Sequence, residues 1–226
     1  MLPLPTAAVA DACIRLGLQV RVGPAQIRPL IAGQRISGPA VPVRHAGSVD
    51  VFLEGMLQAP SGGVLVIDNG GRLDEACVGD LTAWAAKGAG LGAIAIWGCH
   101  RDGAELRQMG FPLWSLGHLP SGPQRLDPRP ADGLDRCGFG TVSVGRQDWT
   151  YADDDGIIFV AAEQRPRVEA AAAAIVATER KQALAAEAGL SMLHQLDVAG
   201  YVAARKVEPT LTFREHLRRR GGGIEE

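Results

Sequence analysis

Residues 63–102 decide the fold of this chain and read GVLVIDNGGRLDEACVGDLTAWAAKGAGLGAIAIWGCHRD. Two short apolar runs, 64–67 and 93–97, predict buried β-strands. Between them, residues 81–87 predict a helix that ends at Gly88. Two short buried strands joined by one helix indicate a right-handed parallel crossover, and therefore an α/β fold.

The predicted crossover gathers polar residues at one edge of the sheet. Residues 68–71, Asp-Asn-Gly-Gly, follow the first strand as a predicted turn. Gly79 and Asp80 precede the helix, while Arg101 and Asp102 follow the second strand. In an open parallel sheet, ligands bind beyond the carboxyl ends of the strands, where helix N-termini also point. Backbone donors, one fixed cation and carboxylates suit a small oxyanion held beside a hard divalent metal ion.

Length, charge and cysteine content exclude several classes of protein. The chain has 226 residues and a formal net charge of −2, with one short basic run, 218–220, which we expect to complement a helix C-terminus. It carries no basic signal-peptide segment and no apolar run near the roughly 20 residues that span a bilayer. The cysteines lack CxxC spacing, which favours a reducing compartment. We therefore expect a cytoplasmic protein that binds neither membrane nor nucleic acid.

The rest of the chain predicts a single domain, 1–226, with a core at about 5–190 and a helical tail at 191–226. Pro42 favours an edge position for the strand at 40–44, and Thr6 is expected to cap the first helix. The remaining predictions are helices at 6–18, 48–58, 103–109 and 163–188, strands at 110–116 and 138–144, a loop at 117–135, and a hairpin over 147–160 that turns at 153–156.

Taken by themselves, Asp80, Arg101 and Asp102 allow two interpretations. An adjacent arginine and aspartate after a strand commonly form an exposed ion pair of little energetic weight, and an aspartate before a helix is commonly an N-cap. However, Asp80 lies 21 positions before Arg101, at the same predicted sheet edge. That juxtaposition favours a functional site, and the residues alone leave both interpretations open.

Other motifs give weaker signals. Residues 153–156 lack the ligand spacing of a calcium loop, so a hairpin turn is the better interpretation. No glycine-rich nucleotide motif and no GxSxG motif occurs. Cys99, His100 and Asp102 do not favour a zinc site, because adjacent residues on an extended chain point to opposite faces. We expect His100 to pack or to support the site from behind.

The spacing of the three charged residues resembles that of a known family. Asp80, twenty intervening residues and then Arg101-Asp102 is similar to the D-X20-R-D pattern of RraA-like proteins, which include metal-dependent 4-hydroxy-4-methyl-2-oxoglutarate aldolases, also called 4-carboxy-4-hydroxy-2-oxoadipate aldolases. The resemblance covers most of residues 5–190. Further similar segments are 6–12, 38–41, 63–68, 111–113 and 152–157.

This resemblance implies a swivelling β/β/α fold, assembled as homotrimers or hexamers with active sites between subunits. It implies that Asp102 is the direct protein ligand to Mg²⁺ or Mn²⁺ and that Arg101 contacts the pyruvate oxygen that becomes the enolate. The backbone amides of Gly79, Asp80, Leu81 and Thr82 would hold the pyruvate carboxylate. The Asp80 side chain would order a metal-bound water, which can take the C4 hydroxyl proton of an aldol, and Glu179 from a neighbouring subunit would assist.

The expected function is therefore a divalent-metal-dependent lyase that forms a pyruvate enolate. Its reaction would be retro-aldol cleavage of a 4-hydroxy-4-methyl-2-oxoglutarate-type substrate, oxaloacetate decarboxylation, or both. A small 2-oxo acid is the expected partner. Two alternatives remain open: a non-enzymatic regulator that binds ribonuclease E, and, less favoured, a demethylmenaquinone methyltransferase. The intact Asp80, Arg101 and Asp102 set favours the enzyme, because a binding module needs no metal site.

Overall fold

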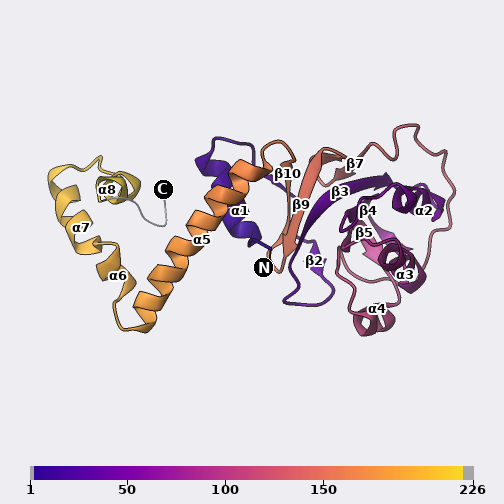
Figure 1. Cartoon of the computed structure of the whole chain (residues 1–226), viewed down its shortest axis with the longest axis horizontal. Helices are drawn as coiled ribbons and strands as arrows, with labels where there is room; N and C mark the ends of the chain where they lie inside the picture. The colour runs from indigo at the N-terminus through magenta and orange to yellow at the C-terminus, as the bar shows by residue number, and fades with distance from the viewer. Residues whose placement is uncertain (1–2, 221–226) are drawn as a thin grey trace.

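An eight-stranded mixed sheet organises the computed structural model, which describes residues 3–220 (Figure 1). Its strand order is β1-β10-β9-β3-β4-β5-β6-β2, and β7 and β8 form a separate hairpin. The strands are β1 Arg21–Val22, β2 Arg28–Pro29, β3 Ile36–Arg44, β4 Val64–Val78, β5 Ala93–His100, β6 Leu113–Ser115, β7 Arg136–Phe139, β8 Val142–Gly145, β9 Asp148–Asp153 and β10 Gly156–Ala161. The helices are α1 Thr6–Arg15, α2 Asp50–Leu57, α3 Asp80–Gly88, α4 Gly103–Met109, α5 Arg165–Glu187, α6 Met192–Gln195, α7 Val198–Val207 and α8 Phe213–Arg219.

The sheet has a parallel half and an antiparallel half. Strands β3, β4, β5 and β6 run parallel, whereas β9, β10 and β1 pair antiparallel beside β3. The predicted crossover is confirmed, because β4 and β5 are parallel neighbours joined by α3. The α/β fold class, with parallel strands at its centre and a long helix near the C-terminus, is confirmed as well.

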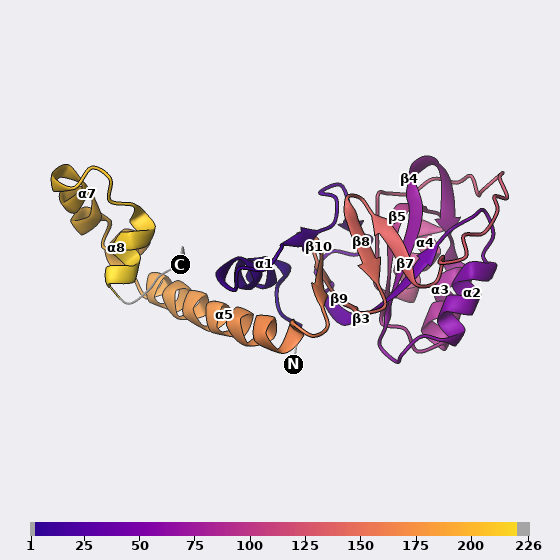
Figure 2. The ribbon, with the colours of Figure 1, turned by 90° about the horizontal axis from the view of Figure 1, so that it is seen from above.

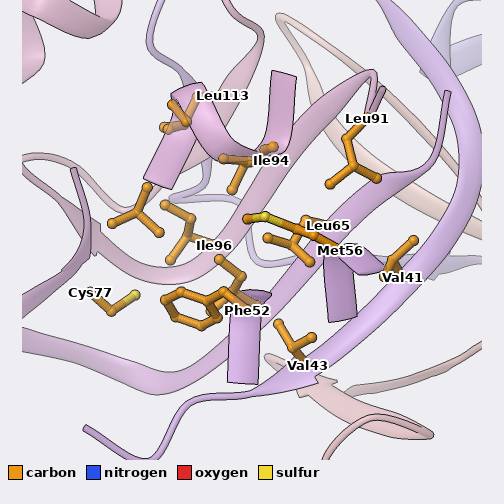
Figure 3. Close-up of a cluster of buried hydrophobic side chains, with 14 of the residues drawn as sticks. Val41, Val43, Phe52, Met56, Leu65, Cys77, Leu91, Ile94, Ile96 and Leu113 are labelled. Carbon is orange, nitrogen blue, oxygen red and sulfur yellow. The ribbon is translucent and has the colours of Figure 1, made fainter. Parts of the chain in front are cut away.

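A tightly packed apolar core fixes α2 and α3 against the parallel half. Phe52 and Met56 of α2 pack on Leu65 of β4 and Ile96 of β5, and all four side chains are buried (Figure 3). Burying a side chain of this size contributes about 1.5–3 kcal/mol. The other face of the parallel strands packs on the β7-β8 hairpin, with Phe139 at its centre. This packing gives the carboxyl ends of β4 and β5 a rigid base.

Strand β4 is longer than predicted, and the turn expected at 68–71 is wrong. The chain stays paired with β5 as far as Val78, with register shifts after Asp68. Gly70 and Gly71 have φ values of +66° and +68°, a conformation that favours glycine and that here forms bulges in the strand. Because β5 itself continues to His100, it offers a partner to the extended β4. The polar turn residues therefore mark an irregular strand.

Three local predictions also differ from the structure. Strand β3 lies inside the sheet, and Pro42 is accommodated because β9 pairs with β3 only as far as Pro39. The strand predicted at 138–144 is the β7-β8 hairpin, which turns at Gly140 with φ +67°. Thr6 does not cap α1; its hydroxyl donates to Asp153 Oδ1 at 2.6 Å.

The C-terminal helices leave the body of the molecule. Helix α5 packs on α1 through Val168, Ala172 and Ile175, then extends away from the sheet toward α6, α7 and α8 (Figure 2). Large apolar side chains on this arm are exposed, including Leu184 and Leu193. Over residues 3–220, no helix has the length and apolar character that crossing a membrane requires.

Candidate functional site

A cavity of about 350 Å³ lies where α3 begins and β5 ends. It brings together the residues that the sequence placed at the start of this helix and directly after this strand, although they come from two separate segments. Asp68 and Asn69, which were expected at the same edge, line a different cavity. The lining residues predicted from sequence are Gly79, Asp80, Leu81, Thr82, Arg101 and Asp102. Their proximity follows directly from the crossover, because the β4–α3 junction and the end of β5 meet at the carboxyl edge of neighbouring parallel strands.

Asp102 has an unusual backbone for an aspartate. Its φ of 58° and ψ of 40° are left-handed, and within residues 3–220 the only other non-glycine residue with positive φ is Asp197. Asp197 caps α7 with its side chain, but Asp102 precedes α4 and makes no such cap. The strained backbone instead turns the Asp102 carboxylate toward α3 and Arg101. Strain without a local structural benefit is typical of functional residues.

The first turn of α3 supplies one backbone donor to this carboxylate. The Asp80 amide donates to Asp102 Oδ2 at 3.3 Å, and the Leu81 amide donates to Asp80 Oδ1 at 2.7 Å. The Thr82 amide has no acceptor among the described residues. Helix N-termini leave such amides unpaired and carry partial positive charge. This end of α3 is therefore built to hold a carboxylate.

Arg101 completes the charged edge of the cavity. Its Nε lies 3.6 Å from Asp102 Oδ2, and about half of its side chain is exposed (49%). The loop at 117–135 crosses close by, so that a Cβ on Gly122 would lie 3.0 Å from Arg101 Nη1. An ion pair with this exposure contributes little to stability. The guanidinium thus remains free to donate to a ligand in the cavity.

His45 also lines the cavity, and the sequence analysis missed it. Its Nδ1 lies 2.8 Å from Asn69 Oδ1, which also accepts from Arg125 Nη2 at 3.0 Å. A guanidinium only donates, so this Asn69 atom is the amide oxygen and His45 Nδ1 must be the donor. Burial lowers the pKa of His45, which leaves Nε2 as an uncharged acceptor. Its position directly after β3, at the same sheet edge, was the available signal.

His100 has the packing role that the sequence predicted. Its Nδ1 lies 2.8 Å from Ser115 Oγ and its side chain is buried. Burial, with help from the nearby His118, lowers the pKa of His100 to about 4. The four cysteines are all buried and free. Burial also raises the pKa of the Cys77 thiol, which lines the inner end of the cavity and is correspondingly unreactive.

Glu179 is not brought to this cavity within one chain. It is an exposed residue of α5, and Figures 1 and 2 show α5 and α3 on opposite sides of the molecule. A role beside Asp80 and Asp102 would require a second copy of the chain.

A metal ion in this cavity would be bound mainly by oxygen atoms. Among residues 3–220 there is no group of three or more His, Cys, Asp or Glu side chains close enough to hold a metal. Asp102 Oδ1 has no hydrogen-bond donor in that part of the chain. A single free carboxylate oxygen does not make a complete protein cage. It does match the way proteins bind Mg²⁺, which keeps several waters and takes only one or two carboxylates.

Comparisons with known proteins agree with this fold. A curated relative from Halorhodospira halophila, named "Putative 4-hydroxy-4-methyl-2-oxoglutarate aldolase", is 33% identical over 65% of this chain and 88% of its own length. The crystal structure of an uncharacterized protein from Pseudomonas syringae pv. tomato has a TM-score of 0.71 and 27% identity, covering 85% of this chain and 92% of that one.

The structure of Streptomyces coelicolor RraAS2, described as an unusual member of the RNase ES inhibitor RraA protein family, has a TM-score of 0.67 and 23% identity, over 80% of this chain and 91% of that one. This likeness concerns the fold. The family model RraA-like, described as Aldolase/RraA, matches residues 6–159. With more than half of its length matched by that model, the chain belongs to the RraA-like family.

Proposed function

We propose that this protein is a divalent-metal-dependent lyase that forms a pyruvate enolate. It would cleave 4-hydroxy-4-methyl-2-oxoglutarate-type aldols, decarboxylate oxaloacetate, or do both. The observation that carries the proposal is the geometry of Asp102. Its strained backbone places Oδ2 of the carboxylate beside Arg101 and the start of α3, and leaves Oδ1 without a hydrogen-bond donor among residues 3–220.

The donor set fits Mg²⁺ or Mn²⁺ bound through Asp102 with water and substrate oxygens completing the coordination. When bound, such an ion is a Lewis acid for the carboxylate and keto oxygens of a 2-oxo acid. The remaining roles belong to the chain. The amides of Gly79, Asp80, Leu81 and Thr82 would bind the substrate carboxylate at the α3 N-terminus, where it would replace the side-chain oxygens that accept from the Asp80 and Leu81 amides.

Arg101 and Asp80 would share the work on the reacting atoms. Arg101 would donate to the keto oxygen, where negative charge develops as the enolate forms. A water held by Asp80 would accept the proton of the C4 hydroxyl during aldol cleavage. The bond between C3 and C4 then breaks, C4 becomes a carbonyl carbon, and C3 is protonated to give pyruvate.

The surroundings of the cavity support an assembled protein. Leu53 of α2 and Leu81 of α3 line the cavity, and with Trp84 of α3 they are about half exposed or more. A patch of this kind indicates an interaction surface. We propose that a neighbouring copy covers it in a homotrimer or hexamer and that Glu179 on α5 of such a copy approaches Asp80.

Pyruvate release tests the proposal. Purified protein would be given 4-hydroxy-4-methyl-2-oxoglutarate or oxaloacetate, with Mg²⁺, with Mn²⁺, or with excess chelator. We expect metal-dependent release that Asp102→Ala reduces at least about a thousandfold, since it removes the protein ligand. Asp11→Ala is a matched control, because Asp11 is an exposed carboxylate on α1, outside the cavity. The ratio between the two substrates would begin to define the natural one.

No turnover by a folded, assembled wild-type protein would contradict the proposal. A regulator that binds ribonuclease E would then be the leading alternative, tested by direct binding of the two proteins. A methyltransferase would require a site for S-adenosylmethionine, and calorimetry that detects no binding of that compound would remove this alternative.

A further inference from the structure

A second cavity, of about 300 Å³, lies on the other side of the candidate metal ligand. The two cavities share Arg101 and Asp102 as a common wall. On its far side, the second cavity is lined by Arg107 of α4 and by His118. A substrate held at Asp102 can therefore extend in either of two directions.

The Arg107 side chain is a cation that has no partner among residues 3–220. It makes no hydrogen bond or ion pair with any other residue of the described part of the chain. Its guanidinium lies over Gly103, where a Cβ would come 3.4 Å from Nη1. The charge thus lies beside the backbone of the residue that follows Asp102. By contrast, Arg125, on the loop that crosses the sheet edge, is neutralised by Glu75 and Asp127.

The first cavity offers no such charge beyond the pyruvate position. Its lining includes the apolar side chains of Val49, Phe52 and Leu53 together with His45, whose imidazole is uncharged. A carboxylate there would lose hydration without gaining a cation, which costs free energy. The second cavity has Arg101 and Arg107, and its one carboxylate, Asp102, is the candidate metal ligand. A second substrate carboxylate is therefore favoured in the second cavity.

We infer that Arg107 is a specificity-determining residue that binds the second carboxylate of a dicarboxylic 2-oxo acid in the cavity beyond Asp102. This inference rests on the proposed pyruvate chemistry and identifies the residue that recognises the other half of the substrate. The guanidinium can donate two parallel hydrogen bonds to a carboxylate, which gives geometric selection as well as affinity.

Two aldols that differ in one group provide the test. In 4-hydroxy-2-oxoglutarate, C4 carries a carboxylate; in 4-hydroxy-2-oxopentanoate, it carries a methyl group. We expect Arg107→Gln to lower kcat/KM for the first by about tenfold, mainly through KM, because a hydrogen bond to a charged group is lost. The second substrate should change less than about twofold. Arg107→Lys, which keeps the charge, should recover part of the selectivity. Arg136→Gln, at an exposed arginine of β7, is the matched control.

The outcomes separate the two proposals. An equal loss on both substrates would overturn the role of Arg107, since a general structural effect does not distinguish carboxylate from methyl. A wild-type protein that turns over both aldols equally well would overturn it too. If the wild-type protein releases pyruvate from neither aldol and not from oxaloacetate, the proposed function itself fails, and this inference fails with it.

Discussion

Two pairs of charged residues in the two halves of the central sheet differ in how completely they are paired: Asp153 and Asp148 in the antiparallel half, and Asp102 and Arg101 in the parallel half. In the antiparallel half, Asp153 of β9 accepts from the Thr6 amide at 2.8 Å and from the Thr6 hydroxyl at 2.6 Å. Asp148 accepts from Arg21 Nη2 and from the Gly145 amide, both at 2.8 Å. Both carboxylates are buried. In this half, the charged side chains hold α1, β1 and β8 in place against the sheet.

In the parallel half, Asp102 and Arg101 are left incompletely paired, whereas Glu75 and Arg125 at the same edge pair with each other. Asp102 receives one long hydrogen bond, of 3.3 Å, and Arg101 pairs with it only at 3.6 Å. Both side chains are more than a third exposed, at 49% for Arg101 and 35% for Asp102. The same residue types therefore serve stability in one half and remain available to a ligand in the other. What distinguishes the two roles is whether the charged side chain has hydrogen-bond and ion-pair partners within the protein, more than its residue type.

The largest effect expected from this comparison is a lower free energy of unfolding when a paired carboxylate is removed. We expect Asp153→Ala to lower the free energy of unfolding by about 2–4 kcal/mol, because it leaves the buried Thr6 amide and hydroxyl without their acceptor. Pyruvate release per folded molecule should stay close to that of the wild type. Denaturant unfolding and kcat measured on the same preparation would check both points. Lost activity with unchanged stability would break the distinction between the halves.

A smaller effect is expected from Arg101→Lys, on activity alone. Lysine keeps the positive charge but loses the planar set of donors aimed at the keto oxygen. We expect kcat/KM for pyruvate release to fall about a hundredfold, the lower end of the range for removing one oriented donor. The melting temperature should not change measurably, because the ion pair with Asp102 is exposed. A shift in stability with unchanged kcat/KM would instead assign Arg101 a structural role.

The sequence predicted which residues meet in the candidate site, because a strand-helix-strand crossover brings residues that are distant in sequence close together in space. Asp80 and Arg101 are far apart in sequence, yet parallel neighbours joined by a helix bring their ends to one edge. The same logic failed for β4, since glycine pairs are compatible with both a turn and a bulged strand, and the choice depended on β5 continuing to His100. That dependence is tertiary and was not visible in 68–71 alone.

Other site residues were missed because their recognition needs three-dimensional contacts. Pro42 predicted an edge strand, whereas β3 is a parallel neighbour of β4, and this pairing places His45 at the cavity. Arg107 lies in a helix whose pattern predicts only an exposed polar face. Its importance arises from the absence of a partner among the described residues and from its position beside Gly103. Neither property can be read from one sequence.

The smallest effect concerns His45, which belongs to neither extreme: it is buried like Asp153 but lines the cavity like Asp102. Burial lowers the pKa of His45, and the charge of Arg125 adds to this effect, while the hydrogen bond to Asn69 and the charges of Glu75 and Asp50 oppose it. Because the pKa in the folded state lies below the roughly 6.5 of an unfolded histidine, the unfolded chain binds more protons in acid. Stability should therefore fall as the pH drops below about 6.5.

His45→Gln would isolate that contribution, because glutamine can still donate a hydrogen bond but does not titrate. We expect the free energy of unfolding, measured between pH 7 and pH 5, to fall less steeply in the variant than in the wild type. The difference in slope cannot exceed about 1.4 kcal/mol per pH unit, the limit for one group. An unchanged slope would mean that His45 is charged in the folded protein as readily as in the unfolded chain. His45 would then add a positive charge to the first cavity. The contrast between the two cavities, which favours a second carboxylate near Arg107, would be lost.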